Sequence, residues 1–101
     1  MKTKLEKKIL KGYEARVTIL KAMAHPTRLF ILDQLKEKPL CVCEINEMIN
    51  ADVSTISKHL SLMKSAGLVS STKSGLQVYY KLETPCILDS LSCIDNKKSN
   101  R

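Results

Sequence analysis

A change of hydrophobic period at Gly67 constrains the fold of this chain more than any other feature. Before this glycine, apolar residues recur at steps of three and four, which is typical of amphipathic helices. After it, residues 68–72 and 77–82 are short and rich in β-forming side chains, with Lys73-Ser74-Gly75-Leu76 between them. The sequence therefore predicts a mainly α fold with a small β-hairpin near its C-terminal end.

Five helices are predicted, four before the hairpin and one after it. Pro26 and Pro39 bracket the second helix, since proline suits a first helical turn and does not continue a helix. Asp52 is a good N-cap for the fourth helix, and Gly67 suits its C-terminal end. The expected spans are 5–24 with a soft break at Gly12, 26–38, 41–49, 53–65 and 86–94. The expected inward-facing residues are Val42, Ile45 and Ile49, then Val53, Ile56, Leu60 and Met63, then Ile87, Leu88, Leu91 and Ile94.

Length and charge limit the class of protein. The 101 residues fit one small domain, expected over residues 1–95, with a disordered basic tail at 96–101. A domain of this size buries little surface and gains stability by dimerising. No apolar run is long enough to span a membrane, and the basic N-terminus lacks the apolar core of a signal peptide, so a cytoplasmic location is expected. A net charge of +7 favours nucleic acid over membrane as the partner.

The third and fourth helices, joined by Asn50-Ala51, form a predicted helix-turn-helix, and the hairpin makes it winged. Short hydroxyl side chains such as Ser54 and Thr55 allow a helix to enter the major groove. Lys58, and Lys73 near the hairpin tip, supply charge to phosphates. A solvated helix face in an unrelated small α/β domain is the alternative. The order of elements on a basic chain favours binding to double-stranded DNA.

Four segments resemble the ArsR/SmtB family of metal-sensing transcriptional repressors. They are LKAMAHPTRLFIL at 20–32, LCVCEI at 40–45, VSTISKHLSLMKSAGLV at 53–69 and SGLQVYYKL at 74–82. The resemblance implies a winged helix-turn-helix repressor rather than an enzyme. It implies a homodimer formed through the first and last helices, which binds an imperfect palindromic operator near its own gene until an inducer releases it. It assigns to DNA the residues Val53, Ser54, Thr55, Ser57, Lys58, His59, Lys73 and Gln77.

The two histidines are expected to have roles other than metal binding. His59 lies next to Lys58 in the predicted recognition helix, which favours contact with DNA over ligation. His25 precedes Pro26 at a helix start, where a capping or core role is expected.

Two of the four cysteines form the motif Cys41-Val42-Cys43. Without an export signal, such cysteines are more often metal ligands, redox groups or buried apolar residues than parts of a disulfide framework. In a regular helix Cys41 and Cys43 point about 200° apart, so binding of one ion by both sulfurs requires the helix start to unwind or bend. We expect that distortion to move the recognition helix and so couple ligand binding to DNA release.

The family resemblance and the softness of thiolate ligands suggest the inducer. A Cys-Val-Cys motif here is similar to sensors of As(III) and Sb(III), and to a cadmium and lead branch. That branch adds N-terminal cysteines, which this chain lacks, and the family's zinc site lacks its histidine after Asp89. Asn46 stands where the arsenic pattern has a third cysteine. The expected metal-ligating set is therefore Cys41 and Cys43 with Cys86 or Cys93 of the same or the other protomer, and no organic cofactor is expected.

Other interpretations of the cysteines remain open at the level of sequence. The chain could be a repressor that responds to thiol oxidation or sulfur species, a sensor of another soft metal such as Cd(II) or Pb(II), or a constitutive DNA binder with silent cysteines. A small thiol enzyme or metal carrier is disfavoured because there is no Cys-x-x-Cys motif and no glycine-rich phosphate loop. Cys86 and Cys93 lie about 10.5 Å apart along one helix and cannot pair within it. A small apolar role on a dimer helix is their alternative.

Overall fold

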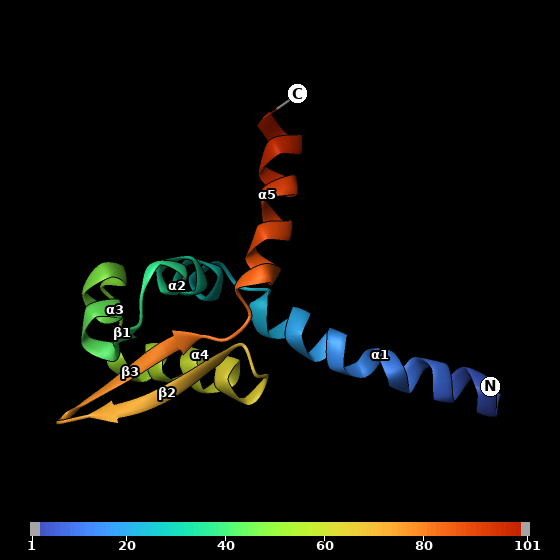
Figure 1. The fold of residues 1–101 in the computed structure, drawn as a ribbon, viewed down its shortest axis with the longest axis horizontal. Helices are drawn as coiled ribbons and strands as arrows, with labels where there is room; N and C mark the ends of the chain where they lie inside the picture. Colours follow the sequence, from blue (N-terminus) through green and yellow to red (C-terminus); the bar gives the residue numbers. More distant parts are fainter. Residues whose placement is uncertain (1–2, 100–101) are drawn as a thin grey trace.

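The computed structural model describes the backbone of residues 3–99 and the side chains of residues 3–95. Five helices and a three-stranded antiparallel sheet form a winged helix-turn-helix, as the sequence predicts (Figure 1). In chain order the elements are α1 Lys4–Met23, α2 Pro26–Glu37, β1 Leu40–Cys41, α3 Val42–Ile49, α4 Val53–Ser65, β2 Val69–Ser74, β3 Gln77–Leu82 and α5 Pro85–Ser99.

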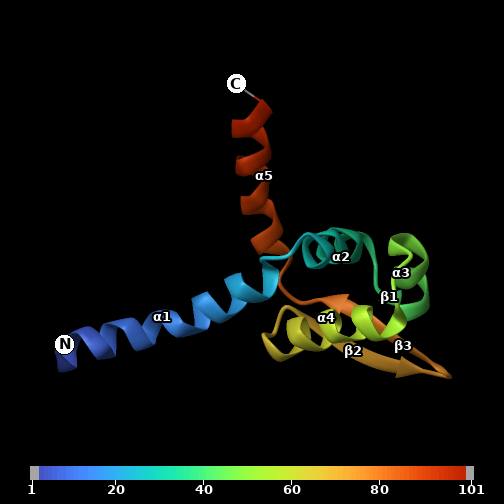
Figure 2. The same cartoon turned by 180° about the vertical axis from the view of Figure 1, so that it is seen from behind.

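Three helices and the sheet form the body of the molecule, and the two terminal helices extend from it. α2, α3 and α4 lie beside the sheet, and the β2–β3 hairpin projects from the side opposite to α1 (Figures 1 and 2). α1 and α5 point away from the body in different directions. No helix in residues 3–99 is long and apolar enough to cross a membrane.

The N-terminal half of the chain follows local capping rules. Thr3 Oγ1 accepts a hydrogen bond from the Glu6 amide and starts α1. The helix continues through Gly12, so the predicted soft break is wrong. α2 begins at Pro26, as predicted, and His25 Nδ1 accepts a hydrogen bond from the Thr27 amide at 3.1 Å. The expected capping role of His25 is therefore confirmed.

A two-residue strand, β1, was missed by the hydrophobic pattern. Leu40 pairs with Tyr80 and Cys41 with Tyr79, so the sheet has three strands in the order β1-β3-β2. This pairing holds Cys41 in an extended conformation with φ −82° and ψ 161°. α3 therefore begins at Val42, one residue later than predicted, because its first expected residue is a strand residue. The pairing joins chain segments that are far apart in sequence, and the hydrophobic period of a single segment cannot predict such a contact.

The hairpin is longer and its turn shorter than predicted. β2 extends to Ser74, which pairs with Gln77 at the end of the ladder, and Lys73 pairs with Val78. Only Gly75 and Leu76 form the turn. Gly75 has a φ of 64°, a value that type II′ hairpin turns require of their first residue and that glycine adopts without steric cost.

The core is aliphatic, and α4, the predicted recognition helix, contributes completely buried side chains to it. Ile56, Leu60 and Met63 are completely buried, as their spacing predicts. Val53 was also expected on that inner face, but its side chain is 57% exposed because it lies in the first turn of α4, beyond the core. The other side chains of the core cluster are Ala22, Met23, Ile31, Leu32, Leu35, Leu40, Ile45, Leu68, Val69, Leu82 and Leu88, and Cys41 is buried as well.

The last helix starts one residue earlier and ends later than predicted. α5 runs from Pro85 to Ser99, so residues 96–99 are helical rather than part of a disordered tail, and residues 100–101 lie outside the described residues. Leu88 is buried as expected, whereas Ile94 is exposed, because the helix leaves the body of the protomer beyond its first turns. A surface ion pair of 3.2 Å between Lys36 and Asp89 joins α2 to α5.

We expect Leu60→Ala to lower the free energy of unfolding by about 2–5 kcal/mol, because it leaves a cavity among completely buried side chains. Leu62→Ala, two residues along the same helix, is the matched control, since that side chain is 46% exposed. Urea unfolding followed by circular dichroism measures both. Equal losses in the two variants would contradict the placement of Leu60 in the core.

Candidate nucleic-acid interface and thiol site

The residues assigned to DNA on α4 lie mostly on its solvent-facing side. Val53, Ser54, Thr55 and Lys58 are exposed, and Ser57 is half-buried. Asp52 stands at the N-cap position, but its side chain makes no capping hydrogen bond. The buried stripe of α4 holds the helix against the core, so that its first turn and hydroxyl side chains face outward.

The wing presents a second exposed polar surface. Lys73 and Gln77 are exposed, as a role in binding DNA requires, and Leu76 at the turn is 97% exposed. Since Gln77 starts β3 directly after the turn, it lies at the end of the hairpin that extends from the body (Figure 1).

His59 differs from the other assigned residues, because its ring lies against α2. It is half-buried, and its ring centroid is 4.5 Å from that of His25. Arg28 Nη1 lies 3.1 Å from His59 Nδ1. A guanidinium can only donate, so Nδ1 is the acceptor and the proton of the neutral ring is on Nε2. His59 is therefore held by neighbouring residues on one edge rather than being free to contact DNA on all sides.

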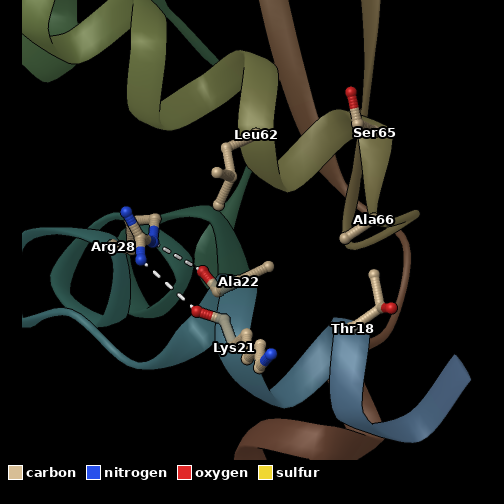
Figure 3. Close-up of a pocket in the computed structure, with 7 residues that line it drawn as sticks. All are labelled: Thr18, Lys21, Ala22, Arg28, Leu62, Ser65 and Ala66. Carbon is tan, nitrogen blue, oxygen red and sulfur yellow. Dashed lines mark hydrogen bonds between the residues drawn. The ribbon is translucent and has the colours of Figure 1, made fainter. Parts of the chain in front are cut away.

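Arg28 joins three helices at this point. Its Nε donates to the Ala22 carbonyl at 2.7 Å and its Nη2 to the Lys21 carbonyl at 3.3 Å, as Figure 3 shows. These carbonyls belong to the last turn of α1, while the bond to His59 reaches α4. A cavity of about 380 Å³ opens beside the guanidinium, between α1 and α4. Arg28 thus sets the position of the recognition helix relative to α1.

The surroundings of His59 disfavour its charged form. Burial of the ring, with repulsion from His25 and Arg28, holds the pKa of His59 below its usual value of 6.5. The neutral ring that accepts the Arg28 hydrogen bond is therefore the form present near neutral pH.

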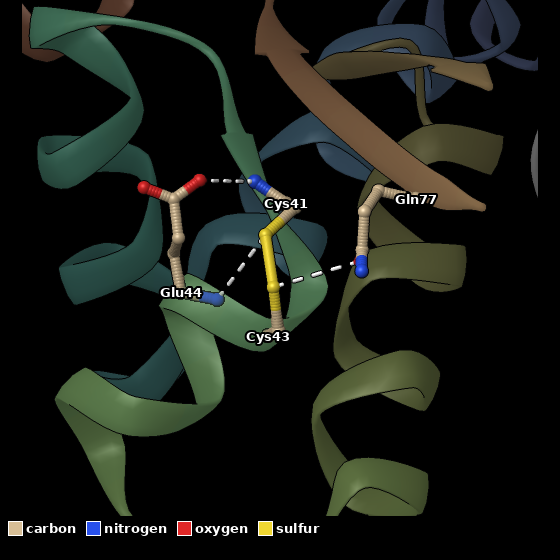
Figure 4. Close-up of a disulfide and its surroundings, with 4 residues drawn as sticks. All are labelled: Cys41, Cys43, Glu44 and Gln77. Atoms are coloured by element: carbon tan, nitrogen blue, oxygen red, sulfur yellow. Dashed lines mark hydrogen bonds between the residues drawn. A yellow bond between two sulfur atoms is a disulfide. The ribbon is translucent and has the colours of Figure 1, made fainter. Parts of the chain in front are cut away.

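The sulfur atoms of Cys41 and Cys43 meet at the N-terminus of α3. They form a disulfide, with Cα atoms 5.4 Å apart, which lies in the usual range for such a bond (Figure 4). Cys41 is buried and Cys43 is exposed. The expectation that α3 must unwind or bend before both sulfurs can face one ligand is wrong, because Cys41 already lies outside the helix as its N-cap.

Cys41 and Glu44 cap α3 reciprocally. The Cys41 Sγ accepts from the Glu44 amide at 3.4 Å, and Glu44 Oε1 accepts from the Cys41 amide at 3.1 Å. This is a capping box in which a sulfur replaces the usual hydroxyl oxygen. The chemical state of Cys41 is thereby tied to the start of the first helix of the helix-turn-helix.

The other two cysteines are not brought to this pair within the protomer. Cys86 and Cys93 are both free and exposed on α5. Among the residues that the structure describes, no group of three or more Cys, His, Asp or Glu side chains is placed to hold a metal ion. One protomer therefore presents a two-sulfur site.

Sequence reasoning missed one contact of the thiol site. Gln77, assigned only to DNA, has its Oε1 3.6 Å from the Cys43 Sγ (Figure 4). The β1–β3 register would place residue 43 opposite residue 77 if β1 continued two residues further. That register is a product of the tertiary fold, so no local signal in the sequence reports it. The importance of Arg28 was also missed, since its partners come from α1 and α4.

Comparison with known proteins identifies the family. The family model described as bacterial regulatory protein, arsR family, matches residues 25–71. The uncharacterized HTH-type transcriptional regulator MJ1325 of Methanocaldococcus jannaschii is 34% identical over 85% of this chain and 98% of its own length. The transcriptional repressor SdpR of Bacillus subtilis is 36% identical over 77% of this chain and 87% of its own length. The chain belongs to the ArsR family of DNA-binding transcriptional repressors, which are not enzymes.

Other relatives show the range of the family. The cadmium resistance transcriptional regulatory protein CadC of Listeria innocua is 41% identical over 75% of this chain, which spans only 55% of its length. Among solved structures, reduced HlyU from Vibrio cholerae has a TM-score of 0.77 and 31% identity, covering 87% of this chain and 96% of that one. The homodimeric winged helix-turn-helix domain of Mb0332 from Mycobacterium bovis has a TM-score of 0.79 at 23% identity, covering 96% and 90%, and shares the fold.

We expect the stability of the protein to fall as the pH is lowered from about 7.5 to about 5.5, in part through His59. Its pKa is lower in the folded protein than in the unfolded chain. The unfolded chain therefore takes up the proton first, and stability present above the usual pKa is lost on acidification. His59→Asn places an amide oxygen near the Nδ1 position without a titrating group, and should reduce this pH dependence.

Urea unfolding across the pH range measures the effect, with the exposed Ser61→Ala on the same helix as control. Identical pH dependence in wild type and His59→Asn would show that His59 does not contribute.

Proposed function

We propose that this protein is a homodimeric repressor that binds a palindromic DNA operator and is released when As(III) or Sb(III) binds the thiolates of Cys41 and Cys43. One observation carries the proposal. The two sulfurs converge at the N-cap of α3, where a change in sulfur chemistry acts on the first helix of the DNA-binding unit. Capping residues typically contribute about 1 kcal/mol to a helix, so an altered cap changes the balance between two arrangements.

Exposed apolar side chains on α1 support the homodimer. Leu5, Ile9, Tyr13, Val17 and Leu20 form one stripe, and each is between 44% and 67% exposed in the protomer. Such a stripe on a helix that projects from the body is suited to pack against another helix. A two-fold dimer through α1 and α5 presents two recognition helices to two half-sites of a palindrome.

Binding of the inducer is a ligand exchange on the chain's own thiols. The Cys41 and Cys43 thiols each lose a proton and replace a hydroxide of arsenous acid, so that two S–As bonds form and two waters leave. The third position then keeps its hydroxide or takes a thiol of Cys86 or Cys93 from either protomer. Soft sulfur ligands favour thiophilic ions over magnesium or calcium. Sb(III) follows the same exchange.

A redox-responsive repressor is the second candidate, and a specific observation favours it. The Cα separation of 5.4 Å allows Cys41 and Cys43 to form a disulfide without movement of the backbone. With a peroxide as oxidant, the two thiols give up two protons and two electrons, an S–S bond forms and the O–O bond is reduced to two waters. Cd(II) and Pb(II) are alternative inducers to be compared with As(III), since one relative, CadC, is named for cadmium resistance.

We expect arsenite to weaken operator binding by the fully reduced protein by about 5- to 150-fold, the usual range of allosteric coupling. The operator is first selected from random DNA, and binding is followed by fluorescence anisotropy. Cys41→Ser and Cys43→Ser should bind the operator and lose the response. Loss of the response in Cys86→Ser or Cys93→Ser would identify the third ligand.

Peroxide and Cd(II) are tested in parallel on the same protein. Release by peroxide and not by arsenite would replace the proposed inducer with the redox candidate. Operator binding unaffected by any of these reagents would contradict a sensory role for the pair.

We expect operator affinity to fall steeply with salt, because lysine side chains displace counterions from phosphates. Lys58→Ala, which removes an exposed cation from α4, should reduce the slope of log K against log salt by about 0.9 per protomer. Lys36→Ala is the control, since Lys36 pairs with Asp89 on the face where α2 meets α5. A flat salt response in the wild type would contradict the DNA-binding assignment.

A further inference from the structure

The N-terminal half of α1 carries a charged surface that neither the core nor the thiol site uses. The lysine stripe is the set of exposed residues Lys4, Lys7, Lys8 and Lys11, which recur at steps of three and four along the helix. With about 100° between successive helical residues, the four lysines lie within an arc of about 100°. The apolar stripe of α1 is centred about 170° away from them, so the two stripes lie on opposite sides of one helix.

The charge of the lysine stripe is not balanced within the described part of the protomer. Among residues 3–95, the ion pairs are Lys36–Asp89 and Lys81–Glu83, and neither involves this stripe. Lysines three and four residues apart repel one another, and the helix dipole disfavours cations near the N-terminus. Of the two acidic residues of α1, Glu6 lies on the side of the apolar stripe and Glu14 follows the last lysine. An anionic partner would therefore relieve an unfavourable arrangement of charge.

The opposite placement of the two stripes favours DNA over a membrane as that partner. A basic helix that lies on a membrane buries its apolar face in the lipid, so a membrane would compete with the dimer contact for the apolar stripe. A DNA duplex requires only the lysine stripe, which faces outward when the apolar stripe packs against another helix. In both views, α1 extends at the level of α4 and the hairpin, whereas α5 rises away from them (Figures 1 and 2).

We propose that the lysine stripe binds phosphates of the same DNA duplex that α4 and the wing contact. From Lys4 to Lys11 the stripe extends about 10.5 Å along the helix. Duplex DNA carries one negative charge per about 1.7 Å of its axis, so several phosphates lie within this length. Such contacts add affinity and fix the orientation of the protomer without reading sequence. This inference rests on the operator binding of the proposed function and is independent of the inducer.

Acetylation of lysines tests the contact directly in the whole, reduced protein without inducer. The protein is treated with an N-hydroxysuccinimide ester of acetate, with and without the operator, and each lysine is followed by mass spectrometry. The operator should remove most of the reactivity of the lysine stripe, as it does for Lys58 on α4. Lys38, which is exposed at the end of α2, should keep its reactivity. A lysine stripe that reacts equally with and without the operator would overturn the proposal.

The salt dependence of operator binding gives a second measurement. Lys4→Gln combined with Lys8→Gln removes two charges per protomer and should lower the slope of log K against log salt by about 1.8 per protomer. Glutamine keeps the helix propensity of lysine, and the apolar stripe is unchanged. Lys36→Gln combined with Lys38→Gln is the matched control, because it removes the same charge from α2 and should leave the slope unchanged. Equal changes in the two double variants would show an effect of net charge alone and contradict the contact.

Vesicles of phosphatidylglycerol and phosphatidylcholine provide the membrane arm of the acetylation experiment. Protection of the lysine stripe by vesicles and not by the operator would make the membrane its partner and overturn the proposal. Protection of Lys58 without protection of the lysine stripe would overturn this inference alone, and operator binding would stand. Absence of any operator binding would overturn both. A failure of arsenite to release the operator would contradict only the proposed inducer.

Discussion

The pairing of Leu40 and Cys41 with Tyr80 and Tyr79 is the contact on which the functional part of this structure depends. These two residues of β1 join the helix-turn-helix to the wing, and they hold Cys41 in the extended conformation that an N-cap requires. The same pairing directs residue 43 toward Gln77. The Cys41–Cys43 pair, the start of α3 and the wing strand therefore meet at one place.

The position of α4 depends on a different set of contacts. Its apolar face is completely buried, and His59 is held through Arg28 to the last carbonyls of α1. Since α1 also carries the exposed apolar stripe that suits a dimer contact, the orientation of each recognition helix is tied to the helix that would set the spacing between protomers. α4 is thus held by the core and by Arg28, whereas the wing contacts the Cys41–Cys43 pair through Gln77.

Local patterns predicted the elements, and they failed where distant segments meet. Short-range steric and hydrogen-bonding rules account for the helix starts at Pro26 and Val53. The same rules account for the turn at Gly75 and for the capping role of His25. The two-residue strand at Leu40 could not be predicted from such rules, because two residues are too few to show a hydrophobic period. Its pairing partners also lie about forty residues further along the chain. Because this strand was not predicted, Cys41 was wrongly assigned to the helix that follows it.

The amino-acid sequence by itself determined the fold class, the family and the residues with reactive chemistry, since these depend on hydrophobic period, caps, turns and motif order. Only the tertiary structure decided how those residues combine. It brought Cys41 and Cys43 together without unwinding α3, left Cys86 and Cys93 on a separate helix, and placed Gln77 against a sulfur. The physical reason is that strand register and helix packing are set by the burial of side chains from the whole chain, which no local stretch encodes.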